Sequence, residues 1–172
     1  TRAEPPGLEE LRAELPDVTI YAGEYPEDLI AGAAELVVSP GIAMDDPLVA
    51  AALADDVAVV GDIDLFMREA NAPVVGITGS NAKSTVTELV GQMARDAGRD
   101  VGVGGNLGTP ALDLLSPGRD LYILELSSFQ LERAGVLGLA SAAVLNVSPD
   151  HLDRHGTMAA YHMAKHRIFR GC

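Results

Sequence analysis

The sequence predicts an α/β fold with parallel sheets, in which a partial N-terminal domain over residues 1–72 precedes the first half of a second domain over residues 73–172. Short apolar runs alternate with segments of helical periodicity, the pattern of parallel strands connected by helices. Residues 73–90 pass from an apolar run through small polar residues into an amphipathic segment, which predicts a buried strand, a tight turn and a helix. Polar side chains also follow the predicted strands of the second domain at their carboxyl ends.

In the first 72 residues the predicted elements are short. Pro6 suits the first turn of a helix, because its fixed φ is helical. An apolar run that enters turn residues at Ser39 and Pro40 is typical of a strand and its end. The predicted helices span residues 7–15, 26–34, 47–54 and 62–70, and the predicted strands span residues 18–21, 35–38 and 57–60. Residues 71–73 are the predicted domain boundary.

From residue 73 the alternation continues with longer elements. The predicted strands span residues 74–78, 101–103, 120–126 and 141–147, and the predicted helices span residues 83–97, a short segment ending near Leu115, and an amphipathic segment over 155–170. In an open parallel sheet, ligands bind in the crevice beyond the carboxyl ends of the strands. Asn106, Glu125, Ser127 and His151 fall at such ends, so we expect them to line one crevice.

The turn after the first of these strands has the composition of a phosphate-binding loop. Consecutive backbone N–H groups at a helix start form a cradle for anions. Lys83 would place its charge on the outer phosphates of ATP, and Ser84 or Thr85 would offer a hydroxyl to the accompanying Mg²⁺. The competing interpretation is a solvated strand-to-helix connection with a capping serine. The predicted ATP-binding residues are Gly79, Ser80, Asn81, Ala82, Lys83, Ser84 and Thr85.

Ala82 departs from the P-loop pattern, in which glycine precedes the lysine. Alanine keeps its N–H group, but its methyl lies where the backbone approaches phosphate and where glycine supplies permissive dihedral angles. We therefore expect Ala82 to weaken nucleotide affinity.

Composition limits the possible partners. Twelve Lys and Arg against 25 Asp and Glu give a formal charge of −13, which disfavours binding to nucleic acid. The single Cys172 allows no internal disulfide, and the longest apolar run is shorter than the roughly 20 residues of a membrane helix. We expect a monomeric cytoplasmic protein that binds neither nucleic acid nor membrane. The chain starts without Met and stops without a closing strand, which indicates a fragment.

Three further residues are candidates for chemistry. Glu125 ends an apolar strand, where a carboxylate is costly unless a cation such as Mg²⁺ meets it, although it could instead reach solvent or an arginine. His151 could bind a second Mg²⁺ or orient a phosphate, although a lone loop histidine is usually structural. Lys165 lies on the predicted last helix, where a lysine is by default a solvated charge.

Four segments together resemble the Mur ligases of peptidoglycan synthesis, and they do so in order and spacing. They are residues 78–85, 104–108 (Gly-Gly-Asn-Leu-Gly), 124–130 (Leu-Glu-Leu-Ser-Ser-Phe-Gln) and 146–154 (Asn-Val-Ser-Pro-Asp-His-Leu-Asp-Arg). Residues 39–42 and 61–66 are similar to the members that add D-glutamate. The resemblance spans essentially the whole chain.

The resemblance implies a three-domain enzyme with a UDP-sugar-binding N-terminal domain, a P-loop NTPase-like central domain that binds ATP, and an amino-acid domain. It would phosphorylate the L-alanyl carboxylate of UDP-N-acetylmuramoyl-L-alanine with ATP, after which the D-glutamate amine attacks the acyl phosphate and an amide forms.

The resemblance also implies roles for particular residues. Lys83, His151 and Lys165 would be catalytic, and the metal ligands would be Ser84, Glu125, His151 and Lys165, the lysine after carbamylation by CO₂. Contacts to the UDP-muramoyl substrate would come from Thr1, Arg2, Gly41, Asn106, Ser127 and Gln130.

The chain lacks several parts of the family pattern, namely the first strand with its turn, the second half of the central domain and the amino-acid domain. We therefore expect these 172 residues alone to be inactive. The alternatives are a neighbouring ligase of the Mur or folylpolyglutamate type, or a non-catalytic module that binds nucleotide or UDP-sugar.

Overall fold

The computed structural model describes residues 5–23, 25–26 and 28–172, which form two compact units, Thr1–Ala34 and Glu35–Cys172. The first unit contains helix α1 (Leu8–Glu14), which buries none of its residues. Its boundaries lie within one residue of the predicted helix over 7–15. The predicted boundary at residues 71–73 stays a prediction.

Two predicted elements of the first unit are wrong. Residues 18–21 form no strand, and Val18 and Tyr21 are 54% and 46% exposed, so their apolar side chains have no face to bury. The described residues between 26 and 34 form successive turns instead of a helix. Their backbone N–H groups bond three residues back, as from Ala31 to Asp28, and Gly32 takes a φ of 77° that ends any helical continuation.

The second unit begins with a two-stranded parallel sheet. Strand β1 (Glu35–Val37) pairs with β2 (Ala58–Val60), and helix α2 (Pro47–Ala54) connects them. Asp46 caps α2 through its side chain, which accepts from the N–H of Leu48 at 3.0 Å. Helix α3 (Asp62–Glu69) follows and carries Ile63 and Phe66 into a buried core.

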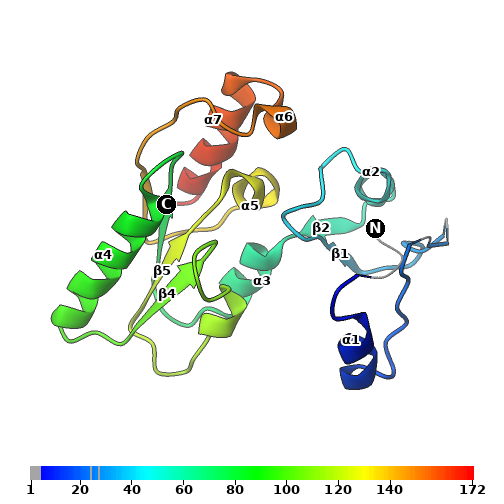
Figure 1. Ribbon diagram of the computed structural model, residues 1–172, viewed down its shortest axis with the longest axis horizontal. Coiled ribbons are helices and arrows are strands. Elements are labelled where there is room, and N and C mark those ends of the chain that lie inside the picture. Colours follow the sequence, from blue (N-terminus) through cyan, green and yellow to red (C-terminus); the bar gives the residue numbers. More distant parts are fainter. Residues whose placement is uncertain (1–4, 24, 27) are drawn as a thin grey trace. The chain divides into compact units, whose positions relative to one another are not determined.

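A four-stranded parallel sheet forms the larger part of this unit (Figure 1). Its strand order is β4 (Val101–Gly105), β5 (Leu121–Glu125), β3 (Val74–Thr78) and β6 (Ser141–Val144). Because β3 lies between two strands that follow it in sequence, the turn after it lies in the middle of the carboxyl edge. The structure confirms the predicted α/β class with parallel sheets.

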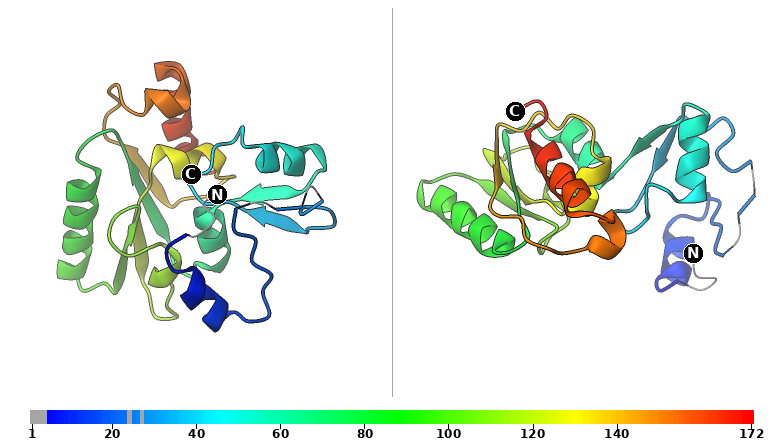
Figure 2. Two further views of the ribbon diagram at one scale, coloured as in Figure 1. Left: turned by 45° about the vertical axis from the view of Figure 1, so that its right-hand side comes forward. Right: turned by 90° about the horizontal axis from the view of Figure 1, so that it is seen from above.

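The two faces of this sheet are covered by different helices, as Figure 2 shows from two sides. Strand residues alternate between the faces, so Ile77 and Ile123 pack with helix α4 (Lys83–Asp96). Tyr122 and Leu124 point the other way, toward α3 and the short helix α5 (Ser128–Arg133). The ring of Tyr122 meets Phe66 edge to face at 5.1 Å, which fixes α3 against the sheet.

The segment predicted as one helix over residues 155–170 begins at the last residue of a short helix and continues as two further elements. These three elements are α6 (Leu152–His155), α7 (Met158–His166) and the 3₁₀ turn η2 (Arg167–Phe169). Gly156 takes a φ of 72°, and Thr157 begins α7 by accepting from the N–H of Ala160. A second 3₁₀ turn, η1 (Leu112–Leu114), is the predicted short helix near Leu115.

Helix α5 was not predicted. Its signal is a capping box, because the Ser127 side chain accepts from the N–H of Gln130 while the Gln130 side chain accepts from the N–H of Ser127. The described helices include none with the length and apolar character of a membrane span.

Candidate functional site

Hydrogen bonds to neighbouring segments hold the turn between β3 and α4 in place. Thr78 ends the strand and donates its hydroxyl to the carbonyl of Leu126 at 2.7 Å. Ser80 donates its N–H to the carbonyl of Asn146, and its hydroxyl lies 2.9 Å from that of Tyr161. Asn81 donates its N–H to the side chain of Asn146 at 2.9 Å. The exit of strand β6 therefore holds residues 80 and 81 of the turn.

Ala82 precedes α4 in the left-handed conformation, with φ of 64° and ψ of 7°. This conformation costs an L-residue roughly 1–2 kcal/mol, and glycine adopts it without that cost. The structure thus gives a physical basis for the expected effect of alanine here, although the effect on nucleotide affinity stays a prediction.

Glu125 joins the strand end at β5 to two other predicted site segments, the turn after β3 and the segment after β4. Its side chain is buried at the end of β5, with 2% of the residue exposed. One carboxylate oxygen accepts from the Ser84 hydroxyl at 2.7 Å and the other accepts from the Asn106 amide at 2.8 Å. Side chains from residues 84, 106 and 125 therefore meet at the carboxyl edge of the sheet, as parallel topology requires.

A magnesium ion fits this donor set. The described part of the chain contains no group of three or more His, Cys, Asp or Glu side chains arranged to hold a metal. Mg²⁺ usually takes only one or two protein carboxylates, with phosphate and water completing its shell. The carboxylate of Glu125 with the adjacent hydroxyl of Ser84 matches that requirement.

Two lysines, one at the start of α4 and one on α7, donate hydrogen bonds to backbone carbonyls of the turn after β3. Lys83 donates to the carbonyl of Ser80 at 3.2 Å, and Lys165 donates to the carbonyl of Gly79 at 2.8 Å. Lys165 is 2% exposed and lies over the Tyr161 ring, 4.6 Å from its centre. Burial, and then the positive charge of Lys83, lower the pKa of Lys165 to about 8. Lys165 is therefore no solvated surface charge.

His151 lies at the start of α6 in a left-handed conformation, with φ of 49°. Its Nε2 is 3.4 Å from a carboxylate oxygen of Asp150, and its ring packs on Phe129 at 4.9 Å. No hydrogen bond or ion pair among the described residues joins His151 to Glu125. The side chain is half exposed, and its ring also lies 6.3 Å from that of Tyr161.

The residues that the resemblance assigns to the UDP-muramoyl substrate lie in separate places, and Asn106 of this set lies at Glu125. Ser127 and Gln130 form the capping box of α5, and Gln130 also donates to a carboxylate oxygen of Asp62 at 2.9 Å. The second oxygen of Asp62 is buried and has no partner among the described residues. Gly41 lies in the loop after β1. Thr1 and Arg2 lie outside the described residues.

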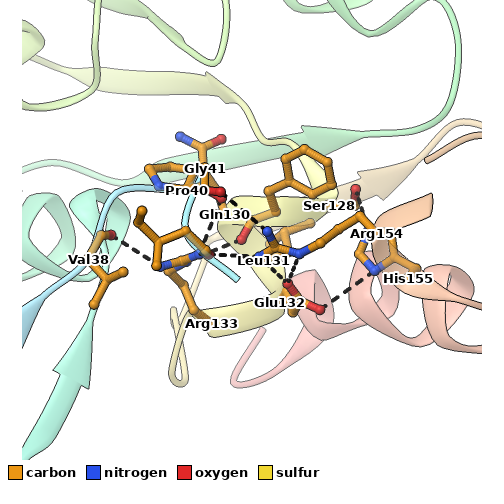
Figure 3. Close-up of polar contacts among 12 residues, drawn as sticks. Val38, Pro40, Gly41, Ser128, Gln130, Leu131, Glu132, Arg133, Arg154 and His155 are labelled. Atoms are coloured by element: carbon orange, nitrogen blue, oxygen red, sulfur yellow. Dashed lines mark hydrogen bonds and ion pairs between the residues drawn. The ribbon is translucent and has the colours of Figure 1, made fainter. Parts of the chain in front are cut away.

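Sequence reasoning missed a polar cluster beside this site, shown in Figure 3. His155 is buried with its Nε2 3.0 Å from the Ser128 hydroxyl and its Nδ1 3.7 Å from Glu132. Burial lowers the pKa of His155, although the Glu132 carboxylate acts against this. Arg133 and Arg154 bind backbone carbonyls of the loop after β1. Their acceptors lie about 90 or more residues away, and no local pattern reports such distant contacts.

Comparison with known proteins gives two matching domain families. Residues 77–172 match the Mur ligase middle domain, and residues 1–61 match the Mur ligase MurD-like N-terminal domain.

Curated relatives match along the whole chain. It is 60% identical over 172 residues to a UDP-N-acetylmuramoylalanine–D-glutamate ligase of Marinobacter nauticus, covering 100% of this chain and 39% of that protein. It is 58% identical over 171 residues to the ligase of the same name from Pseudomonas aeruginosa, covering 99% of this chain and 38% of that protein. The chain thus spans about two fifths of the length of these relatives.

A solved structure shares the fold. It is the UDP-N-acetylmuramate:L-alanyl-γ-D-glutamyl-meso-diaminopimelate ligase of Neisseria meningitidis, with a TM-score of 0.57 and 18% identity, covering 99% of this chain and 58% of that one.

Proposed function

This chain belongs to the Mur ligase family, and from that premise we propose that it is part of an ATP-dependent ligase that adds D-glutamate to UDP-N-acetylmuramoyl-L-alanine. The relatives named for this reaction match it at 58–60% identity along its whole length. The observation that carries the proposal is the junction at Glu125, where the P-loop serine and the asparagine after β4 share one buried carboxylate. The reaction would take place in the cytoplasm with small-molecule substrates.

The phosphate-binding turn would hold ATP. The backbone N–H groups at the start of α4 point along the helix axis and favour negative charge. Lys83 Nζ rests on the Ser80 carbonyl, from which it can swing to a phosphate oxygen, since a neutral acceptor holds a cation less strongly than an anion does. This side chain would stabilise the charge on the phosphoryl group that is transferred to the L-alanyl carboxylate.

Glu125, Ser84 and His151 would hold magnesium. The bound ion would neutralise phosphate charge and act as a Lewis acid. Asn106 and Ser84 orient the Glu125 carboxylate by occupying both of its oxygens, so its position is set before a ligand arrives. Asp150 lies beside the His151 ring, with a carboxylate oxygen 3.4 Å from Nε2.

Lys165 would be carbamylated. A pKa of about 8 leaves a larger share of its amine uncharged near neutral pH than an ordinary lysine has. The nitrogen lone pair would add to the carbon of CO₂ and the ammonium proton would pass to solvent, which leaves an anionic carbamate. The exchange of a cation for an anion would then suit Lys165 to a metal. NMR of protein in ¹³C-bicarbonate should show a carbamate signal that Lys165→Arg lacks, and an identical spectrum of the two proteins would exclude this modification.

The experiment that tests the function is a phosphate-release assay on the full-length protein with ATP, UDP-N-acetylmuramoyl-L-alanine and one amino acid. Release should require D-glutamate, and L-lysine, meso-diaminopimelate or glycine should not replace it. Lys83→Met should abolish release, because it removes the charge at the phosphates. Release that is independent of the amino acid, or that prefers another one, would contradict the proposal.

The 172 residues alone should release no phosphate in the same assay, because they span only 39% of the relative from Marinobacter nauticus. Measurable turnover dependent on all three substrates would contradict this expectation.

A further inference from the structure

The backbone of the loop after β1, residues 38–42, is bound by two arginines from the other part of the unit (Figure 3). This loop is the carboxyl end of the two-stranded sheet, the edge at which parallel sheets bind ligands. Its carbonyl groups cannot pair within a strand, and buried carbonyls without partners are costly. Val38 is buried, so its carbonyl in particular needs a donor from outside the loop.

Arg133 supplies most of these donors from the end of α5. Its Nη1 donates to the carbonyl of Val38 at 3.3 Å, and its Nη2 donates to the carbonyls of Pro40, at 3.2 Å, and Ile42, at 2.5 Å. The residue is 6% exposed, so these bonds lie largely out of water. The planar guanidinium presents its N–H groups in a fixed fork, which a lysine cannot reproduce.

Arg154 approaches the same loop from α6. Its Nη2 donates to the Ile42 carbonyl at 2.8 Å and also to the Glu132 carboxylate at 2.9 Å, and its Nη1 lies 3.4 Å from the Gly41 carbonyl. The Ile42 carbonyl thus accepts from both arginines. Glu132 lies between the two positive charges and offsets their repulsion.

These contacts connect the loop with both halves of the proposed active site. Arg133 is the last residue of α5, the helix that Ser127 and Gln130 cap at its start. Arg154 lies three residues after His151, on the short helix that His151 begins.

We propose that Arg133 and Arg154 are positioning residues that hold the 38–42 loop, through its backbone carbonyls, in the orientation that binds the UDP-muramoyl substrate beside the ATP site. This role rests on the proposed function. The two arginines do not touch the substrate in this proposal. They act by fixing Gly41 and its neighbours, because a misplacement of about 1 Å can cost as much as a hundredfold in rate.

The test compares Arg133→Met and Arg154→Met with Arg167→Met in the full-length protein. Arg167 is the matched control, since it also donates to two backbone carbonyls, those of Leu131 and Ala134, but to none in the loop. Isothermal titration would measure the dissociation constants of UDP-N-acetylmuramoyl-L-alanine and of an ATP analogue. Hydrogen exchange would follow the N–H groups of Val38 and Ile42, which are bonded to Val60 and Ser39.

The two loop variants should raise the dissociation constant of the UDP-sugar at least about tenfold and speed exchange at both N–H groups, while affinity for the ATP analogue changes by less than about threefold. Arg133→Lys should bind the UDP-sugar about as weakly as Arg133→Met, because an ammonium group lacks the fixed planar set of N–H donors of a guanidinium. The Arg167 variant should change neither affinity beyond about threefold, whatever its loss of stability.

Equal effects of all three methionine variants on UDP-sugar binding would overturn the positioning role. The proposed function would still stand in that case if the wild-type protein catalyses the D-glutamate-dependent reaction. If the wild-type protein binds no UDP-N-acetylmuramoyl-L-alanine, the proposed function fails, and with it the role in substrate binding. Exchange that stays unchanged in both loop variants would show that the arginines do not hold the loop at all.

Discussion

At the scale of single residues, the effect that we expect of Ala82 rests on its backbone conformation at the start of α4. Its φ of 64° places the residue in the left-handed region, which disfavours a β-carbon. Ala82→Gly should therefore raise the free energy of unfolding by about 1 kcal/mol and tighten ATP binding. Urea unfolding and titration with ATP would measure the two effects.

The control for this prediction is Ala94→Gly in the last turn of α4, where the backbone is helical. There the added freedom should lower the free energy of unfolding by about 1 kcal/mol, the opposite sign. If both glycines destabilise the protein, the left-handed conformation of Ala82 carries no cost, and equal ATP dissociation constants for wild type and Ala82→Gly would exclude an effect on binding.

His155 gives a pH-dependent contribution to stability. Burial lowers the pKa of His155 below its usual 6.5, so the unfolded chain takes up this proton first as pH falls. The contribution is fully favourable above pH 6.5 and is lost as pH drops from 6.5 toward the lower pKa of the folded state. His155→Gln should flatten this part of the stability profile, as measured by urea unfolding between pH 5 and 8.

His162→Gln is the matched variant, because His162 lies on the exposed side of α7. It should leave the slope of the profile as it is in the wild type. A slope that survives in His155→Gln would mean that another group takes up the proton.

At the scale of elements, α4 and β4 approach closely because Gly91 has no side chain. A β-carbon at this position would lie 2.7 Å from a γ-carbon of Val103, and valine can give little because its χ1 is restricted. Alanine favours a helix over glycine by about 1 kcal/mol, whereas overpacking costs about 1–3 kcal/mol. We expect the cost of overpacking to exceed the gain in helix propensity.

Gly91→Ala should therefore lower the free energy of unfolding by about 1–2 kcal/mol. In the double variant Gly91→Ala/Val103→Ala the new methyl has room, so the combined loss should be smaller than the sum of the two single losses. Chemical unfolding of the four proteins of this cycle measures the coupling. Additive losses would show that the helix moves away without contact at Val103.

At the scale of the whole chain, the structure separates Thr1–Ala34 from Glu35–Cys172. Helix α1 buries none of its residues, whereas the sheets and their two apolar clusters belong to the second unit. A chain of residues 35–172 should thus unfold cooperatively, with a thermal midpoint within about 5 °C of the 172-residue chain. Circular dichroism during heating measures this. A fall of more than about 10 °C would show that the first unit contributes to the core of the second.

The agreement between sequence and structure follows the strength of local signals. Strand β3 and helix α2 have the predicted boundaries, because an unbroken apolar run and an Asp-Pro start are local features. The strand predicted at residues 18–21 fails since a strand needs a partner, which local composition does not report. The final helix divides at Gly156, whose positive φ depends on how α6 and α7 pack.

The site shows the same division. Polar residues at strand ends predicted one crevice lined by Asn106, Glu125, Ser127 and His151. The structure places Asn106 in hydrogen-bond contact with Glu125, and Ser84 of the turn joins them. Among the described residues, no hydrogen bond joins Ser127 or His151 to that carboxylate. Arg133 and Arg154 escaped prediction because an arginine near a helix end is ordinary until its acceptors are known.

The sequence by itself determined the α/β class, the strand–turn–helix around residue 80 and the family resemblance, because each depends on residues that are neighbours along the chain. The tertiary structure alone decided the burial of Lys165, the two hydrogen bonds to Glu125, and the hydrogen bonds from two arginines to the loop after β1. These features depend on which distant groups share a space without water. Desolvation and hydrogen-bond geometry arise only when the chain has folded.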